Sequence, residues 1–282
     1  MVVQTYSDSE SQTAGEFWRV VVDPGSIGMP ESIAGEIASY TGEPLVDVLQ
    51  KMETGMHDLK KMWEGSEIDR TDPESVASFY RDQFVEAYEL ANWHCGRTNG
   101  EVPLNYAYAA LFAKARGLKR ALDYGAGIGT GSLCLASAGC EVESADVARD
   151  LVRFTGHRMS LRGFTPRLID LNTPNRPRRN YYDIVTCFDV LEHVPDQLAT
   201  LRMLATYLRR GGYLLVNLMD DSTHDERPMH ISSAGDWLAM VRKTRLKPEW
   251  PSFGDGFQVL TLNRTAWLTN RIAGFIEDRR RP

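Results

Sequence analysis

One short stretch, residues 121–131, constrains the fold of this chain more than any other. Within it, residues 125–129 read Gly-Ala-Gly-Ile-Gly and follow directly after a short apolar segment. Glycine accepts positive φ angles and has no Cβ atom, so such a turn lets the backbone pass close to a ligand. Residues 132–138 suit a helix, and Gly139 suits its end. The stretch therefore predicts a strand, a glycine turn and a helix that border a nucleotide pocket.

Two classes of cofactor use such a turn, and the glycine spacing separates them. A dinucleotide fingerprint reads Gly-x-Gly-x-x-Gly and places a diphosphate at the helix N-terminus. Here the third glycine, Gly129, comes one residue earlier, and an acidic residue, Asp123, ends the first strand. That carboxylate would repel a diphosphate, but it would attract a cation such as the amino group of S-adenosylmethionine (SAM). The spacing therefore favours SAM over a nicotinamide dinucleotide.

The pattern Asp123-x-Gly125-x-Gly127-x-Gly129 resembles the first motif of the class I SAM-dependent methyltransferases. Further motifs follow in the order that this family shows, and the resemblance covers residues 118–265. The segment Val-Leu-Glu-His-Val-Pro-Asp after the fourth strand is similar to that of the ubiquinone-biosynthesis type of small-molecule O-methyltransferase. The other matching segments are 141–146, 168–171 and 182–189, which are interpreted as the second strand, the end of the third strand and the fourth strand. The last matching segment, 208–216, is interpreted as a helix end, a double-glycine turn and a fifth strand.

This resemblance implies an α/β fold with a Rossmann-like, seven-stranded, mostly parallel sheet that has helices on both faces. Residues 118–282 would form the class I SAM-dependent methyltransferase domain, with a helix at 237–241 and the last two strands at 245–246 and 257–262. One strand of the sheet would run in the reverse direction. Residues 1–117 would form an N-terminal α-helical cap that recognises the substrate.

The resemblance also implies which residues bind the cofactor. Asp146 would accept hydrogen bonds from the two ribose hydroxyls, and Asp170 would meet the adenine amino group while the next backbone N–H meets a ring nitrogen. Taken singly, an aspartate after an apolar strand is often only a turn former or a helix cap, so the ordered set carries this interpretation. The implied cofactor-binding residues are Asp123, Gly125, Ala126, Gly127, Gly129, Asp146, Val147, Asp170, Leu171, Phe188 and Asp189.

Two histidines are the candidate catalytic residues. His193 would border the acceptor pocket, and its ordinary pKa of about 6.5 suits a general base. Glu192 and His193 could equally form a hydrogen-bonded pair that only fixes the loop. The polar stretch 220–230 would overhang the acceptor pocket and bring His230 to the substrate. Its histidines and acids show no ligand spacing typical of a metal site, so the sequence predicts no metal.

The segment before the first strand shows helical patterns. Apolar residues recur at helical spacing over residues 44–65, and residues 72–91 carry one apolar stripe that predicts a second helix. Residues 103–116 predict a third helix, whereas residues 17–22 are compatible with a strand or a helix. The residues of this cap that we expect nearest the pocket are Trp93, His94, Asn105, Tyr106 and Tyr108.

Composition limits the partners. The 282 residues carry a net charge of −6, which argues against a nucleic-acid substrate. No apolar run is long enough to span a membrane, and the first ten residues lack the pattern of a secretory signal. The four cysteines form no Cys-x-x-Cys pair, so neither a disulfide framework nor a zinc site is indicated. We therefore expect a cytoplasmic protein with a small-molecule acceptor, and the oligomeric state stays open, a homodimer included.

Three functions remain open at this level. The leading one is transfer of the SAM methyl group to an oxygen or nitrogen atom of a small molecule. The second uses the carbon chain of SAM instead, in a cyclisation or an aminocarboxypropyl transfer. The third is a SAM-binding regulator without chemistry. The cofactor motifs are shared by all three and do not separate them.

Overall fold

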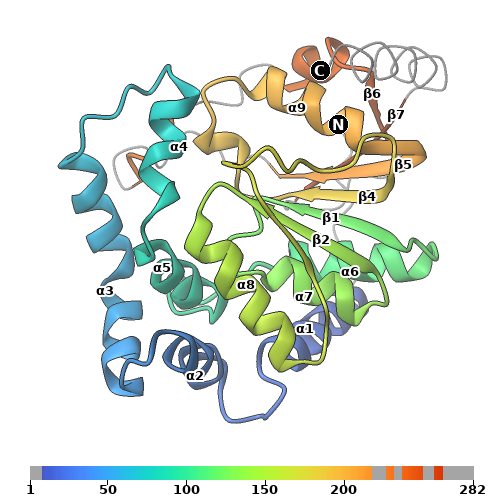
Figure 1. Ribbon diagram of the computed structural model, residues 1–282. Helices are drawn as coiled ribbons and strands as arrows, with labels where there is room; N and C mark the ends of the chain where they lie inside the picture. Colours follow the sequence, from blue (N-terminus) through green and yellow to red (C-terminus); the bar gives the residue numbers. More distant parts are fainter. Residues whose placement is uncertain (1–7, 218–226, 232–236, 250–256, 263–282) are drawn as a thin grey trace.

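The computed structural model describes residues 8–217, 227–231, 237–249 and 257–262 (Figure 1). Their strands form one seven-stranded sheet in the order β3-β2-β1-β4-β5-β7-β6. Strands β1 to β5 pair in parallel, and β7 runs antiparallel to both of its neighbours, which confirms the fold class that the sequence implied. The strands are β1 (Arg120–Tyr124), β2 (Glu141–Asp146), β3 (Arg167–Asp170), β4 (Tyr182–Cys187), β5 (Leu208–Val216), β6 (Leu246–Pro248) and β7 (Gln258–Leu262).

Helices cover both faces of this sheet (Figure 1). Successive strand residues point to opposite faces, so Ala121 joins one hydrophobic cluster and its neighbour Leu122 joins the other. Leu133 of α7 and Phe154 of α8 belong to the cluster of Ala121, whereas Leu201 of α9 belongs to that of Leu122. The helices are α1 (Asp8–Val22), α2 (Met29–Thr41), α3 (Leu45–Glu64), α4 (Pro73–Arg81), α5 (Val85–His94), α6 (Asn105–Ala115), α7 (Thr130–Ser137), α8 (Arg149–Leu161), α9 (Gln197–Tyr207), α10 (Trp237–Arg242) and the short 3₁₀ helix η1 (Leu191–His193).

The direction in which strands are added reverses between β1 and β4. From β1 the sheet continues to β2 and β3 on one side, and from β4 it continues to β5 on the other. The connections that leave the two central strands therefore diverge, which opens a crevice at their carboxyl ends. The glycine turn follows β1, and residues 188–189 follow β4, so both segments border this crevice.

The N-terminal cap is helical throughout its described elements. Helices α3 and α6 confirm two of the predicted helices, and the ambiguous segment 17–22 lies in α1. The single helix predicted over residues 72–91 is wrong, because α4 ends at Arg81 and α5 begins at Val85. The Gln83 side chain accepts a bond from the Glu86 backbone N–H at 3.2 Å, and such a local bond competes with a continuous helix.

The start of β5 also differs from the sequence-based interpretation. A helix end and a turn were expected at residues 208–212, but α9 ends at Tyr207 and β5 begins at Leu208. The pairing register with β4 shifts between Tyr182 and Ile184, so the double glycine lies in an irregularity within the strand. A Cβ atom at Gly212 would stand 2.7 Å from the Tyr182 carbonyl oxygen, so this close approach of the two strands requires glycine.

The cap and one face of the sheet share a hydrophobic core. Trp18 of α1 and Met52 of α3 belong to the same cluster of buried residues as Leu133 and Ile184. The division of the chain at residues 117 and 118 stays a prediction, because this shared cluster crosses it. Among the residues that the structure describes, no helix combines the length and the apolar character needed to cross a bilayer.

Helices α3 and α5 pack closely at a glycine, which yields a stability prediction. A Cβ atom at Gly55 would lie 2.6 Å from the Glu89 backbone nitrogen, whereas one at Gly35 in α2 would meet no atom within 4 Å. Gly55→Ala should therefore lower the free energy of unfolding by about 1–3 kcal/mol, because helix backbone must move. Gly35→Ala, the matched control, should raise it by about 0.4–1 kcal/mol. Urea unfolding of the two variants checks this, and equal stabilities would contradict the packing.

Candidate functional site

The glycine turn adopts the backbone that its sequence predicts. Gly125, Gly127 and Gly129 have φ angles of 72°, 51° and 75°, a region that residues with a Cβ atom rarely occupy. A Cβ atom at Gly125 would also clash with the Val190 side chain. The turn is bonded to the neighbouring strand, since the Gly125 N–H donates to the Ala145 carbonyl oxygen at 2.8 Å. These contacts hold the turn against β2 and leave one side of it open.

A cavity of about 600 Å³ lies on that open side. Its volume falls within the range of roughly 300–1,000 Å³ that is usual for small-molecule sites. The glycine turn and the ends of the parallel strands form one wall, and α4, α5 and the start of α6 form another. The implied site residues that line it are Gly125, Ala126, Gly127, Asp146, Val147, Leu171, Phe188, Asp189 and His193, joined by His94 and Tyr106 of the cap.

Asp146 connects the end of β2 to the glycine turn. Its two carboxylate oxygens accept backbone N–H bonds from Gly127 at 2.8 Å and from Ala148 at 2.9 Å. Burial raises the pKa of Asp146 above its ordinary value, although these two bonds oppose the rise. The carboxylate is thus held in place at the cavity wall, where the resemblance expects the ribose.

Asp123 lies beneath the turn instead of on the cavity wall. Its carboxylate accepts bonds from the Ser132 hydroxyl at 2.7 Å and from the Thr186 hydroxyl at 2.8 Å. Burial raises the pKa of Asp123, and the two hydroxyl bonds partly offset that effect. Asp123 and Gly129 are not among the described residues that line the cavity. The contacts of Asp123 tie β1 to α7 and β4, so its contact with the cofactor amino group stays a prediction.

The end of β3 differs in detail from what the resemblance implied. The Leu171 N–H donates to the Asp146 carbonyl oxygen at 2.9 Å, so this donor extends the strand pairing and is not free for an adenine nitrogen. The Asp170 carboxylate accepts two bonds from Asn172, at 2.8 and 2.7 Å, and pairs with Arg149 at 3.4 Å. Burial would raise the pKa of Asp170, but these partners outweigh it and lower the pKa. Of these two neighbours, Leu171 lines the cavity and Asp170 does not, so an adenine contact of Asp170 stays a prediction.

Asp189 stands at the end of β4 in an unusual conformation. Its φ angle of 56° is rare for a residue with a side chain, and such strain often marks a functional position. Its carboxylate accepts bonds from the Asn217 amide at 2.6 Å and from the Tyr106 hydroxyl at 3.0 Å. The cap residue Tyr106 thereby reaches the strand end. The expected cap residues Trp93, Asn105 and Tyr108 are not among the described residues that line the cavity.

His193 lines the cavity next to Tyr80, which belongs to the apolar stripe of residues 72–91. The Tyr80 hydroxyl lies 3.0 Å from Nδ1 of His193, and the ring of His193 also bonds the Met229 backbone. Burial, followed by the neighbouring His230, lowers the pKa of His193 to about 3. The imidazole is therefore neutral at neutral pH. A tyrosine inside an apolar helical stripe needs a partner for its hydroxyl, and this was the signal available for Tyr80.

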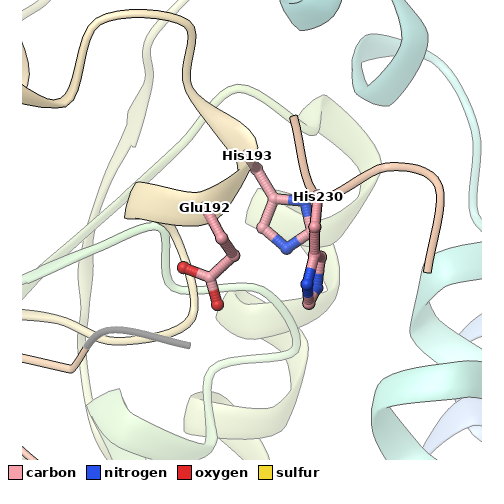
Figure 2. A group of neighbouring side chains, drawn as sticks. All are labelled: Glu192, His193 and His230. Carbon is pink, nitrogen blue, oxygen red and sulfur yellow. The ribbon is translucent and has the colours of Figure 1, made fainter. Parts of the chain in front are cut away.

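Glu192, His193 and His230 form a cluster that the sequence only partly indicated (Figure 2). One ligand atom from each lies within 4.8 Å of the others, and the rings of His193 and His230 stand perpendicular at 4.9 Å. The Ile231 N–H donates to the Glu192 carbonyl oxygen at 2.8 Å and so fixes the segment that carries His230. His230 itself is not among the described residues that line the cavity. The remaining predictions for residues 220–226 lie outside the described residues.

One carboxylate and two imidazoles are a donor set that a divalent transition metal accepts. Burial, and then the charge of Asp189, raises the pKa of Glu192 to about 8, so this carboxyl tends to hold a proton. His193 is bonded to Tyr80 and to the Met229 backbone, and a metal ion would have to displace at least one of these bonds. The absence of a metal stays a prediction. A metal ion bound by Glu192, His193 and His230 would contradict it.

Comparisons with known proteins place the chain in a family. Residues 99–260, more than half of the chain, match the family model described as a methyltransferase domain. A ubiquinone biosynthesis O-methyltransferase of Nitrosospira multiformis is 28% identical over 125 residues, which cover 42% of this chain and 50% of that protein. The enzyme of the same name from Xanthomonas campestris pv. campestris is 32% identical over 158 residues, which cover 52% of this chain and 65% of that protein.

The chain thus spans between half and two thirds of the length of these curated relatives. Among solved structures, the YcgJ protein of Bacillus subtilis matches with a TM-score of 0.44 and 22% identity, covering 51% of this chain and 69% of that one. Membership in a methyltransferase-domain family implies SAM as the cofactor. Because residues 99–260 match its model, the chain belongs to the methyltransferase-domain family.

Proposed function

We propose that this chain transfers the methyl group of SAM to an oxygen or nitrogen atom of a small molecule. The observation that carries the proposal is that one cavity reaches from the glycine turn to His193. A cofactor held at the turn and an acceptor held near His193 would therefore share a single cavity. The printed names of the curated relatives support an oxygen acceptor. The neutral imidazole of His193 on the cavity wall also supports it, because it could accept a proton from a hydroxyl.

The residues of the cavity suit a cationic cofactor. Glu86, Asp146, Asp189 and Asp196 line it together with Arg176. Burial raises the pKa of Glu86, Asp146 and Asp189, so a bound cation would stabilise their charged forms. An acidic wall favours a sulfonium cation over a neutral or anionic ligand. SAM, when bound, supplies a methyl group on a sulfonium, which is already a good leaving group. We propose that Asp146 and the glycine turn hold its nucleoside part.

The protein then mainly supplies position and a site that excludes water. Holding the acceptor atom in line with the methyl carbon and the sulfur can be worth about 7–11 kcal/mol. A hydroxyl acceptor must also lose a proton, and a general base contributes roughly 10²–10⁴-fold. We propose that the imidazole of His193 takes this proton at Nδ1 once the Tyr80 hydroxyl turns away from that nitrogen, and that His230, which packs against the ring, helps to orient it.

Removal of the Asp146 carboxylate tests the ribose contact. Asp146→Ala should weaken binding of S-adenosylhomocysteine by about 1–3 kcal/mol in calorimetry, because the ribose hydroxyls lose an acceptor. Asp23→Ala is a matched control, since Asp23 also accepts two backbone N–H bonds, at 3.0 and 2.8 Å, in the turn between α1 and α2. Unchanged affinity of the Asp146 variant would move the ribose elsewhere.

Replacement of His193 tests the base. His193→Gln should lower turnover of a hydroxyl acceptor at least tenfold while the affinity for SAM stays intact, because only proton removal is lost. His157→Gln is the control, since His157 is also bonded to a hydroxyl, that of Ser39 at 2.7 Å, but does not line the cavity.

The pH profile sharpens this test. A base must be unprotonated, and with a pKa of about 3 His193 is unprotonated throughout the range from pH 5 to 8. For an acceptor that does not itself titrate there, kcat/KM should show no acid limb near pH 6.5. A limb near pH 6.5 that disappears in the His193 variant would contradict the lowered pKa of His193, whereas full activity of that variant would contradict its role as the base.

A further inference from the structure

A chain of buried polar side chains connects the N-terminal cap to the glycine turn. Glu36 of α2 pairs with Arg158 of α8, whose Nε lies 2.6 Å from the Glu36 carboxylate. Nη1 of Arg158 donates to the Ile128 carbonyl oxygen at 2.6 Å and to the Thr130 hydroxyl oxygen at 2.9 Å. Arg158 and Thr130 are both fully buried. A buried guanidinium thus links the cap to the start of α7, one residue beyond the glycine turn.

His94, at the end of α5, continues this chain into the cavity wall. Its Nδ1 lies 2.9 Å from the Thr130 hydroxyl, and the residue is only 3% exposed. It lines the cavity beside Tyr106, whose ring centroid lies 5.5 Å away. Within the described part of the chain, its other nitrogen, Nε2, is buried and has no hydrogen-bond partner. Burying a polar atom without a hydrogen-bond partner destabilises the folded protein. A ligand atom bonded to this nitrogen would remove that penalty.

The hydrogen bond from Arg158 to Thr130 favours one tautomer of His94. Arginine can only donate, so the Thr130 oxygen accepts from Arg158 and its own hydrogen is free to point at Nδ1 of His94. Burial, followed by the charge of Arg158, lowers the pKa of His94 to about 3, so the ring is neutral. A neutral imidazole that accepts at Nδ1 carries its proton on Nε2. His94 therefore offers the cavity a donor and suits an acceptor group on the ligand.

The position of His94 indicates which ligand group this is. A Cβ atom at Gly131 would stand 2.9 Å from both the Tyr106 ring and the Asp123 carboxylate, so Tyr106 lies at the start of α7. The N-terminal turn of a helix favours an anion. On the proposed function, this is the end of the cavity nearest Asp123, where the amino-acid part of SAM belongs. The carboxylate of that part is the strongest hydrogen-bond acceptor that the cofactor has.

We propose that Nε2 of His94 donates a hydrogen bond to the carboxylate of the amino-acid part of SAM, and that Glu36, acting through Arg158 and Thr130, holds His94 in the donating tautomer. This inference rests on the proposed function. Glu36 is then a positioning residue that never touches the cofactor. The cap completes the cofactor site from α2 and α5, in addition to bordering the acceptor.

A pair of ligands separates this contact from general packing. S-adenosylhomocysteine carries the amino-acid part, whereas 5′-methylthioadenosine has the same nucleoside and thioether without it. In calorimetry, His94→Phe should bind S-adenosylhomocysteine roughly tenfold more weakly or worse, with the affinity for methylthioadenosine changed less than about twofold. Equal weakening of both ligands, or no change in either, would overturn the contact.

Two further variants test the donor and its support. His94→Gln keeps an N–H donor and should recover part of the affinity for S-adenosylhomocysteine that His94→Phe loses. Glu36→Gln keeps the size of the side chain but removes the charge that holds Arg158, and should show the same selective loss as His94→Phe in weaker form. His157→Phe, outside the cavity, should bind both ligands as the unaltered protein does. Circular dichroism checks that each variant is folded.

The outcomes also separate this inference from the function on which it rests. If the unaltered protein binds neither ligand, the proposed function fails and this inference fails with it. If the unaltered protein binds S-adenosylhomocysteine and His94→Phe binds it equally well, only the role of His94 is refuted. If Glu36→Gln weakens both ligands equally, the relay from α2 is refuted.

Discussion

The hydrogen bond from the Gly127 N–H to the Asp146 carboxylate holds the turn after β1 against the end of β2. The Gly125 N–H bond to the Ala145 carbonyl oxygen adds to this attachment, and positive φ angles at three glycines make the tight path sterically allowed. Without this attachment the turn would have no fixed position at the point where β1 and β4 diverge. The cavity exists because the turn stays on its β2 side and leaves the crevice open.

Buried polar groups support the turn from below and from the cap. Asp123 is bonded by hydroxyls from α7 and β4, so the carboxylate is satisfied without help from a ligand. Arg158 bonds the Ile128 carbonyl oxygen within the turn and receives its counter-charge from Glu36 in the cap. Breaking one member of such a network leaves an uncompensated buried charge, which is strongly destabilising. The cap is therefore part of the support of the proposed cofactor site.

Much of the sheet could be read from the sequence, because its signals are local. The second strand was expected at residues 141–146 from the order of the family motifs and lies there, although only Val142 and Ala145 of these six residues are apolar. The break between α4 and α5 was missed, because it depends on one side chain that bonds its own backbone inside an otherwise continuous stripe. Glu36 and Arg158 are paired although they lie 122 positions apart, and no local sequence pattern predicts this pair. The same holds for Tyr80 and His193, which are 113 positions apart.

The central claim is that the cavity between the glycine turn and His193 carries out methyl transfer. The most direct measurement is mass spectrometry of the purified protein incubated with SAM, alone and with a metabolite extract, in which S-adenosylhomocysteine and methylthioadenosine are quantified separately. We expect S-adenosylhomocysteine only when the extract is present, together with a metabolite that has gained one methyl group in place of a hydrogen. Methylthioadenosine as the product would mean that the carbon chain of SAM reacts instead, and the claim would be wrong.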